Sequence, residues 1–247
     1  MFVSTLAFLL SFTSAQARNA VAAKNIVIVH GAFADGSGWE GVFRILTNDG
    51  YNVTIVQNSM ASLAADVTAT QNVLADQNGP VVLVGHSYGG AVITQAGNDP
   101  NVKSLVYVAA YVPDAGESLG SLLAKADPGV AAPPILIDEK KGIALLDRAK
   151  FPESFAADVD PRKAEFLAAS QTPLGLQAVS GLIMTAAWKT KKSYYIIASD
   201  DHMISPADER LMAKRAKSVQ FEIKASHAVY ISQPDKVARV IEEAASN

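Results

Sequence analysis

The chain has 247 residues, a net charge of −3 and 18% charged residues. This length suits one domain with a sizeable core, and the charge balance excludes a basic surface for nucleic acid. The sequence has no cysteine, four histidines and no H-E-x-x-H motif. It therefore excludes disulfides, thiol catalysis and cysteine-based zinc sites, and it indicates no metal.

The first 17 residues carry a pattern of their own. An apolar run from Leu6 to Phe12 is too short to span a bilayer. It is followed by Ala15-Gln16-Ala17, which fits an A-x-A cleavage site, although no Lys or Arg precedes the run. We interpret residues 1–17 as a signal peptide and expect export to the periplasm or medium after cleavage near Ala17. An ordinary N-terminal extension of a cytoplasmic protein is the alternative.

Apolar stretches rich in β-branched residues predict six strands, over residues 25–29, 52–56, 81–84, 103–109, 193–198 and 219–223. Helical spacing of apolar residues predicts helices over 39–48, 59–77 and 88–97. Two further helices are expected to begin at Ser205 and Ser232, each of which has Asp three residues on, a capping-box pattern. This alternation predicts an α/β fold with a doubly wound, mostly parallel six-stranded sheet.

A stretch of some eighty residues separates the fourth and fifth predicted strands, too long for a simple connection. It has a proline-rich part at 128–134, a hairpin pattern at 135–137 and 143–145, and a helical pattern at 160–170. We interpret residues 24–112 and 193–247 as the core and 113–192 as an inserted cap. Ligands of such sheets bind beyond the carboxyl ends of the strands, where this cap would lie.

A G-x-S-x-G motif at 85–89 follows the third strand and precedes a helix. This context is that of a nucleophile elbow, a tight turn that exposes a strained serine, here Ser87, at the helix N-terminus. Glycines at Gly85 and Gly89 fit the lack of space around such a turn. A glycine-rich turn without catalytic role is the alternative.

A serine nucleophile needs a base, and a histidine base needs a carboxylate. His227 follows the sixth strand and is the best base, while Asp200 and Asp201 both follow the fifth strand. The order Ser, Asp, His along the chain is the one expected on this fold. The other three histidines have other expected roles. His86 is expected to point away from the nucleophile and His30 to brace the loop after the first strand. His202 is expected to lie at the surface.

An oxyanion would need two preorganised N–H donors. We expect the backbone amides of Tyr88, directly after the nucleophile, and of Ala32, in the glycine-rich loop after the first strand. Phe33, Tyr111 and Trp188 are candidates to line the substrate pocket, although aromatic residues at such places are as often core.

Four motifs taken together resemble the α/β-hydrolase superfamily: 29–33 (VHGAF), 85–90 (GHSYGG), 201–206 (DHMISP) and 226–227 (SH). More narrowly, they are similar to its small-esterase branch, with plant methyl-ester esterases, hydroxynitrile lyases and bacterial relatives. The resemblance extends from Lys24 to the end of the chain. It implies a six-stranded core with a mostly helical cap and an oxyanion donor at Ala32. It favours Asp201 over Asp200, because the family acid precedes a segment like 204–206.

Two differences between this sequence and other members of the superfamily limit which reaction we expect. Gly31 stands where hydroxynitrile lyases carry threonine, which argues against lyase activity, and Ser87 excludes the aspartate nucleophile of haloalkane dehalogenases. We therefore expect a serine esterase for a small-molecule ester, lactones included, that needs no cofactor or metal, binds no nucleic acid and has no membrane span. The alternatives are a triad-bearing receptor with poor turnover and a cofactor-free haloperoxidase side activity. The sequence carries no signal for an oligomeric state.

Overall fold

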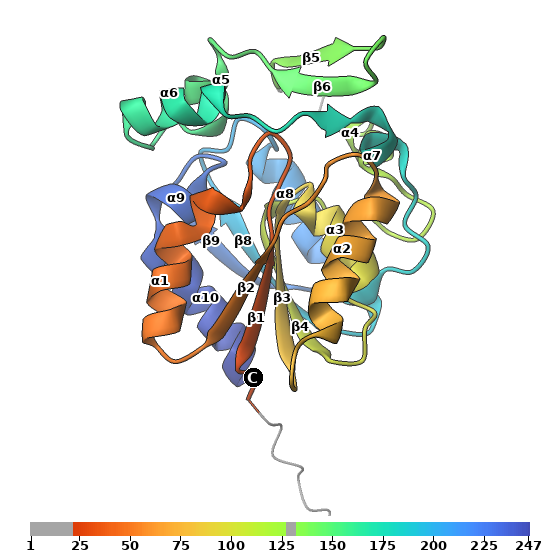
Figure 1. Ribbon diagram of the computed structural model, residues 1–247, viewed down its shortest axis with the longest axis vertical. Helices are drawn as coiled ribbons and strands as arrows, with labels where there is room; N and C mark the ends of the chain where they lie inside the picture. Colours follow the sequence, from red (N-terminus) through yellow and green to blue (C-terminus); the bar gives the residue numbers. More distant parts are fainter. Residues whose placement is uncertain (1–21, 127–131) are drawn as a thin grey trace, which may run out of the picture.

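The computed structural model describes residues 22–126 and 132–247 (Figure 1). The predicted signal peptide and part of the proline-rich stretch lie outside these residues. At the centre is a parallel six-stranded sheet in the order β2-β1-β3-β4-β8-β9, which confirms the predicted fold class. Its strands are β1 (Asn25–Val29), β2 (Asn52–Val56), β3 (Val81–Ser87), β4 (Val102–Ala110), β8 (Lys192–Ala198) and β9 (Val219–Ile223).

The central strands are apolar on both faces, as expected for a sheet covered on both sides. In β1 the side chains alternate, so that Ile26 and Ile28 join one buried cluster while Val27 and Val29 join the other. All four are inaccessible to solvent. The continuous apolar runs that predicted the strands thus serve two cores, one on each face.

Helices cover the two faces (Figure 1). One cluster packs under α1 (Glu40–Asn48), α9 (Val229–Ser232) and α10 (Pro234–Ser246). The other packs under α2 (Leu63–Ala75), α3 (Gly89–Ala96) and α8 (Pro206–Arg215). A short 3-10 helix, η1 (Gly36–Trp39), precedes α1. No helix in residues 22–126 or 132–247 has both the length and the apolar character needed to cross a membrane.

Two predicted helix starts differ from the structure. The helix expected from Ser59 begins only at Leu63, because Met60 has a positive φ of 59° and Ser62 caps α2 by accepting a hydrogen bond from the Ala65 amide. Ser205 does cap α8, but Ser232 does not cap α10: the N-cap is Gln233, and the Ser232 hydroxyl is buried with no hydrogen-bond partner in the part of the chain that the structure describes. Ser232 is instead the last residue of α9, so the helix start predicted from the capping-box pattern was wrong there.

The chain between β4 and β8, residues 111–191, is called the inserted segment below. Figure 1 shows much of its described part over the carboxyl ends of the strands. Its elements are α4 (Leu119–Leu123), β5 (Ile135–Asp138), β6 (Ile143–Leu146), α5 (Phe151–Phe155), α6 (Pro161–Ala169), β7 (Leu174–Gly175), α7 (Leu176–Ser180) and η2 (Ala187–Lys189). The predicted hairpin is present, and β7 extends it to a three-stranded sheet in the order β5-β6-β7.

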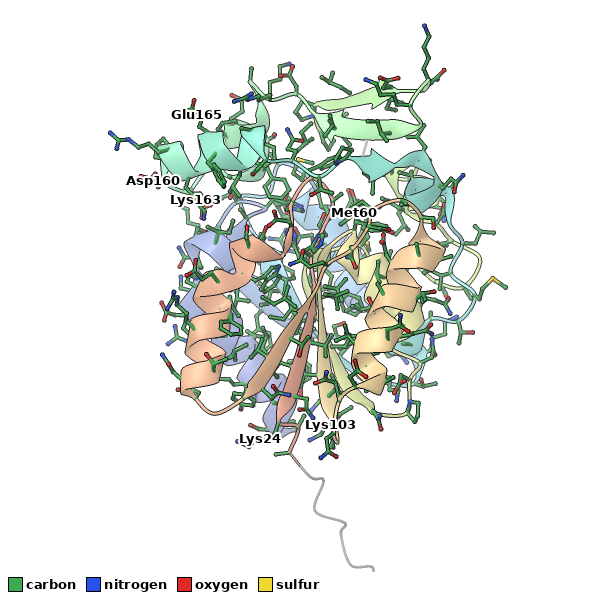
Figure 2. All side chains as sticks on the ribbon, viewed as in Figure 1. Lys24, Met60, Lys103, Asp160, Lys163 and Glu165 are labelled. Carbon is green, nitrogen blue, oxygen red and sulfur yellow. The ribbon has the colours of Figure 1, made fainter. Side chains whose placement is uncertain are left out.

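The inserted segment is attached to the core by main-chain contacts. Figure 2 shows Met60 just below this segment, and the Met60 carbonyl accepts a hydrogen bond from the Gly175 amide at 2.7 Å. A Cβ atom at Gly175 would lie 2.4 Å from the Ala61 carbonyl oxygen, so only glycine permits this approach.

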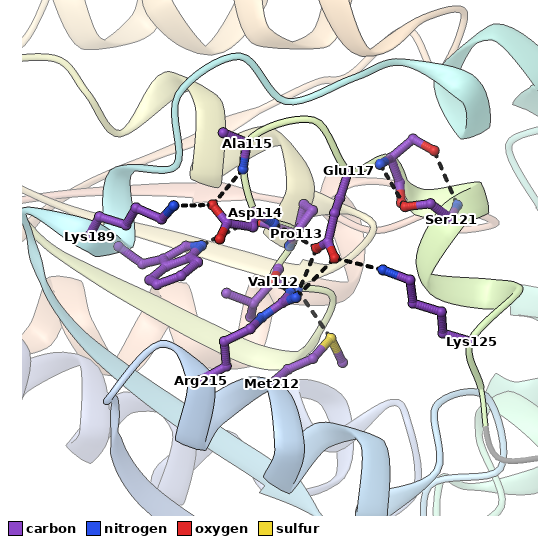
Figure 3. Close-up of polar contacts among 12 residues, drawn as sticks. Val112, Pro113, Asp114, Ala115, Glu117, Ser121, Lys125, Lys189, Met212 and Arg215 are labelled. Carbon is purple, nitrogen blue, oxygen red and sulfur yellow. Dashed lines mark hydrogen bonds and ion pairs between the residues drawn. The ribbon is translucent and has the colours of Figure 1, made fainter.

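A second attachment is an ion-pair network at the base of the inserted segment (Figure 3). Arg215 at the end of α8 pairs with Glu117 at 2.9 Å and also donates to the Val112 carbonyl. Lys189 pairs with Asp114. The Lys189 pair joins the two ends of the inserted segment, and Arg215 ties the first of them to α8, the helix that follows the Asp201 loop.

Candidate active site

The turn between β3 and α3 has the geometry of a strained elbow. Ser87 has a φ of +52°, in the left-handed region that costs a non-glycine residue free energy. A Cβ atom at Gly89 would lie 2.5 Å from the Val29 carbonyl oxygen, and one at Gly85 would lie 2.6 Å from the Gly89 carbonyl oxygen. The backbone is therefore packed too closely for any residue but glycine on either side of Ser87, as the motif predicted.

The loop after β1 lies directly against this turn. A Cβ atom at Gly31 would come within 2.8 Å of the Ser87 Cβ. His30 braces the loop as expected: its Nδ1–H donates to the Gly31 carbonyl, and its Nε2 accepts from the Asn58 amide at 3.0 Å. Because no β-carbon fits at Gly31, the threonine of the lyases is sterically incompatible with this backbone.

The two predicted oxyanion donors lie on either side of this close approach. Ala32 follows Gly31 and Tyr88 follows Ser87, and both residues are buried. In the described part of the chain neither of their N–H groups donates to a main-chain carbonyl of a turn or loop. Both amides are thus without such a partner among the described residues.

The side chains of His227 and Asp201 contact each other in the protein interior. His227 Nδ1–H donates to Asp201 Oδ2 at 2.6 Å, and both side chains are almost inaccessible to solvent. The other carboxylate oxygen of Asp201 accepts from the amides of Met203 and Ile204 at 2.6 and 2.9 Å. Three donors therefore stabilise the ionised form of Asp201. Asp200 is exposed, so it is Asp201 that meets the histidine.

The other nitrogen of the His227 ring, Nε2, is buried and has no hydrogen-bond partner among the described residues. The Ser87 hydroxyl therefore makes no direct hydrogen bond to it in this structure. Such contacts are often long before substrate binds and tighten in the complex.

His86 has a role that sequence reasoning missed. Its ring lies 4.6 Å from the His227 ring, and its Nε2–H donates to the His227 carbonyl at 3.0 Å. Burial, with the neighbouring His227, lowers the pKa of His86 well below its usual value. A neutral His86 therefore holds the main chain of His227 in place.

The inserted segment also contacts the His227 loop, from α5. The Phe155 carbonyl accepts from the Ala228 amide at 2.9 Å, and the Phe155 ring stands edge-on to the His227 ring at 4.8 Å. Ser226 Oγ donates to the Asp158 carboxylate. We call these contacts of Phe155 and Asp158 with residues 226–228 the loop clamp. No sequence pattern marks it, because it depends on how the inserted segment packs.

A buried carboxylate organises the side chain of Tyr88. Asp66 on α2 accepts from the Tyr88 hydroxyl at 2.8 Å and, at its other oxygen, from Ser59 Oγ and the Met60 amide. Burial and then the nearby Asp66 raise the pKa of Tyr88. A signal was present in the sequence: Asp66 lies between Leu63 and Thr70 at helical spacing, on the apolar face of its helix.

A cavity of about 660 Å³ borders the Asp201 loop. Its lining is mostly apolar and includes Tyr111, but neither Ser87 nor His227 lines it. Phe33 is buried beside a small separate pocket. Trp188 is not among the lining residues of the large cavity, and its indole N–H donates to the Pro113 carbonyl. His202 is exposed, as expected, and lines the cavity.

Within residues 22–126 and 132–247 no group of three or more His, Asp or Glu side chains is arranged to hold a metal ion.

Comparison with known proteins places this geometry in a family. A model described as the alpha/beta hydrolase family matches residues 26–240. An alpha/beta hydrolase, nvfD, of Aspergillus novofumigatus is 29% identical over 244 residues, covering 89% of this chain and 96% of the relative. A carbendazim hydrolyzing esterase of Nocardioides sp. is 36% identical over 118 residues, covering 42% and 49%. The solved structure of a pyrethroid hydrolase from Sphingobium faniae superposes with a TM-score of 0.77 at 22% identity, covering 90% and 97%.

Proposed function

Because the chain belongs to the alpha/beta hydrolase family, we propose that it is a serine hydrolase of small carboxylic esters with Ser87, His227 and Asp201 as catalytic triad. The observation that carries the proposal is the buried 2.6 Å hydrogen bond between His227 and Asp201, together with a serine held at positive φ at the end of β3. The esterase named among the relatives supports an ester as the bond that is cleaved.

In the proposed acylation step the Ser87 hydroxyl oxygen attacks the ester carbonyl carbon while its proton passes to His227 Nε2. Asp201 holds the imidazole with Nε2 free of a proton and stabilises the imidazolium that forms. The carbonyl oxygen becomes an oxyanion between the amides of Ala32 and Tyr88. The tetrahedral intermediate then collapses, and the alcohol leaves with the proton from Nε2.

Deacylation repeats the step with water. His227 Nε2 takes a proton from water, the hydroxide attacks the acyl carbon, and the proton returns to Ser87 as the acid is released. With a lactone the alcohol stays attached to the acyl group, so the single product is a hydroxy acid. No cofactor is required in either half-reaction.

The apolar lining of the cavity beside Asp201 supports an apolar substrate group on that side. We propose that the inserted segment acts as a cap that supplies this surface.

The experiment that tests the triad is hydrolysis of p-nitrophenyl esters, from acetate to long acyl chains, by the wild type and Ser87→Ala. Removing the nucleophile of a triad that acts as a unit should lower kcat by about 10⁶-fold. The acyl length that is cleaved fastest would size the pocket.

The matched control is Ser246→Ala, at an exposed position near the end of α10, which should leave kcat unchanged. A loss of less than tenfold in Ser87→Ala would refute the assignment. A single stoichiometric burst without turnover in the wild type would instead favour a triad-bearing receptor.

A further inference from the structure

The carboxyl group of Glu209 lies in the apolar interior of the protein. It lies on the face of α8 that packs on β8, and none of its surface is accessible to solvent. No ion pair involves it in the described part of the chain, since the basic side chain beside it, Arg210, pairs with Glu222 at the surface. An ionised carboxylate in such a place carries a large desolvation cost.

The contacts of Glu209 leave one oxygen without a donor. Its Oε2 accepts from the Ala198 amide, at the end of β8, at 3.0 Å. Its Oε1 is buried and has no hydrogen-bond partner among the described residues. Asp201, three residues beyond Ala198, is held at the same place, since its amide donates to the Ala198 carbonyl at 3.2 Å. An orphaned oxygen beside a carboxylate is explained if one of the two groups carries a proton.

The donors show which group is the charged one. Asp201 accepts from two amides and from the His227 ring, whereas Glu209 accepts from one amide. Two buried carboxyl groups held close to each other do not both ionise. The other titratable groups that face Glu209 are Tyr195 on β8 and Tyr111 after β4, neither of which supplies positive charge. Burial, followed by the Asp201 charge, raises the pKa of Glu209 well above its usual value.

We propose that Glu209 is a positioning residue, held as the neutral acid, whose proton forms a hydrogen bond to the Asp201 carboxylate. Its consequence for catalysis rests on the proposed function of the Asp201–His227 pair. The bond helps to fix Asp201 and disperses part of its negative charge. It thereby limits how strongly Asp201 stabilises the imidazolium that forms in the proposed reaction.

Two substitutions separate this role from simple packing. Glu209→Gln keeps the shape and a neutral N–H donor, whereas Glu209→Leu keeps the volume and removes the donor. The His227 imidazole is titrated by NMR in both variants and in the wild type, and the pH profile of kcat/KM is measured beside it. The matched control is Glu243→Gln, the same chemical change at an exposed position on α10.

We expect Glu209→Gln to keep the His227 pKa and to retain kcat/KM within about threefold. In Glu209→Leu the Asp201 charge is less dispersed, so the His227 pKa should rise by about one unit and kcat/KM at neutral pH should fall about tenfold. A fall of the His227 pKa in both variants would show that Glu209 is ionised in the wild type and would overturn the proposal. If the His227 pKa and kcat/KM are unchanged in both variants, Glu209 contributes only to packing and the proposal is wrong.

Infrared spectroscopy keeps the test decisive if Glu209→Leu does not fold, or if no ester is turned over. At neutral pH the wild type should show the C=O stretching band of a protonated carboxyl group. The band should vanish in Glu209→Gln and persist in Ser87→Ala and Glu243→Gln. A wild type without this band would overturn the proposal whatever its activity.

Discussion

The strain at Ser87 is maintained by its neighbours rather than by its own side chain. A φ of +52° costs about 1 kcal/mol or more for a non-glycine residue. The close contacts of Gly85 and Gly89 with surrounding carbonyl groups leave the backbone no relaxed alternative. The hydroxyl is thereby held in place before any substrate arrives, which is the property that a nucleophile requires.

The adjacent residues Asp200 and Asp201 allow a controlled test of the proposed triad. Asp201→Asn should lower kcat by about 10⁴-fold, because an amide cannot keep the His227 ring in the reactive tautomer. Asp200→Asn makes the same chemical change at the neighbouring exposed residue and should leave kcat within about twofold. Steady-state kinetics on one p-nitrophenyl ester compares them, and similar losses in the two variants would contradict the assignment of Asp201.

At the scale of elements, the loop clamp joins the inserted segment to the residues around His227. Asp158→Ala should lower kcat/KM about fivefold, because the Ser226 hydroxyl loses a charged acceptor and the loop that carries His227 gains freedom. Hydrogen exchange of the Ala228 amide should accelerate in this variant, since that amide is held by α5.

The control for the loop clamp is Glu165→Ala, at an exposed position of α6 in the same segment (Figure 2). It should change neither kcat/KM nor the exchange of Ala228. If Asp158→Ala also leaves both quantities unchanged, the clamp does not hold the histidine loop.

The elements also show where local sequence patterns suffice. The strands, the Gly85–Gly89 turn and the α8 cap at Ser205 were predictable because each is decided within a few residues. The start of α2 was not, since the position of Met60 depends on Asp66 and on the contact with Gly175. The Ser232 cap failed because a short helix, α9, occupies that stretch.

The candidate active site was likewise predictable from the sequence only in part. The residues of the proposed triad lie at or after the carboxyl ends of strands, so the rule for parallel sheets was enough to predict that they share one edge of the sheet. His86 and Phe155 act through contacts made only in the folded chain, and nothing in their immediate sequence marks them. Glu209 did have a visible signal, an acid three and four residues before Met212 and Ala213 on the buried face of its helix.

For the whole molecule, the buried titratable groups predict how stability depends on pH. The raised pKa of Glu209 means that the unfolded chain loses its proton first, so its contribution is complete below about pH 4 and declines as pH rises. The decline should be about 1.4 kcal/mol per pH unit until the folded group ionises. The lowered pKa values of His86 and His30 act oppositely, and stability is lost as pH falls below about 6.5.

Urea unfolding of the wild type and Glu209→Gln between pH 4 and 8 measures this dependence. The two curves should share the loss on the acid side, because both histidines are present in each protein. Above about pH 5 the wild type should lose stability relative to Glu209→Gln. Parallel curves over the whole range would mean that Glu209 has an ordinary pKa.

The inserted segment is continuous and joins β4 and β8, which are neighbours in the sheet. In evolutionary terms, it is therefore a unit that recombination can replace without interrupting the strand order of the core. The loop clamp restricts that freedom. A segment acquired from another gene would need its own equivalents of Phe155 and Asp158 to hold residues 226–228. Substrate preference and the integrity of the histidine loop would thus be inherited together.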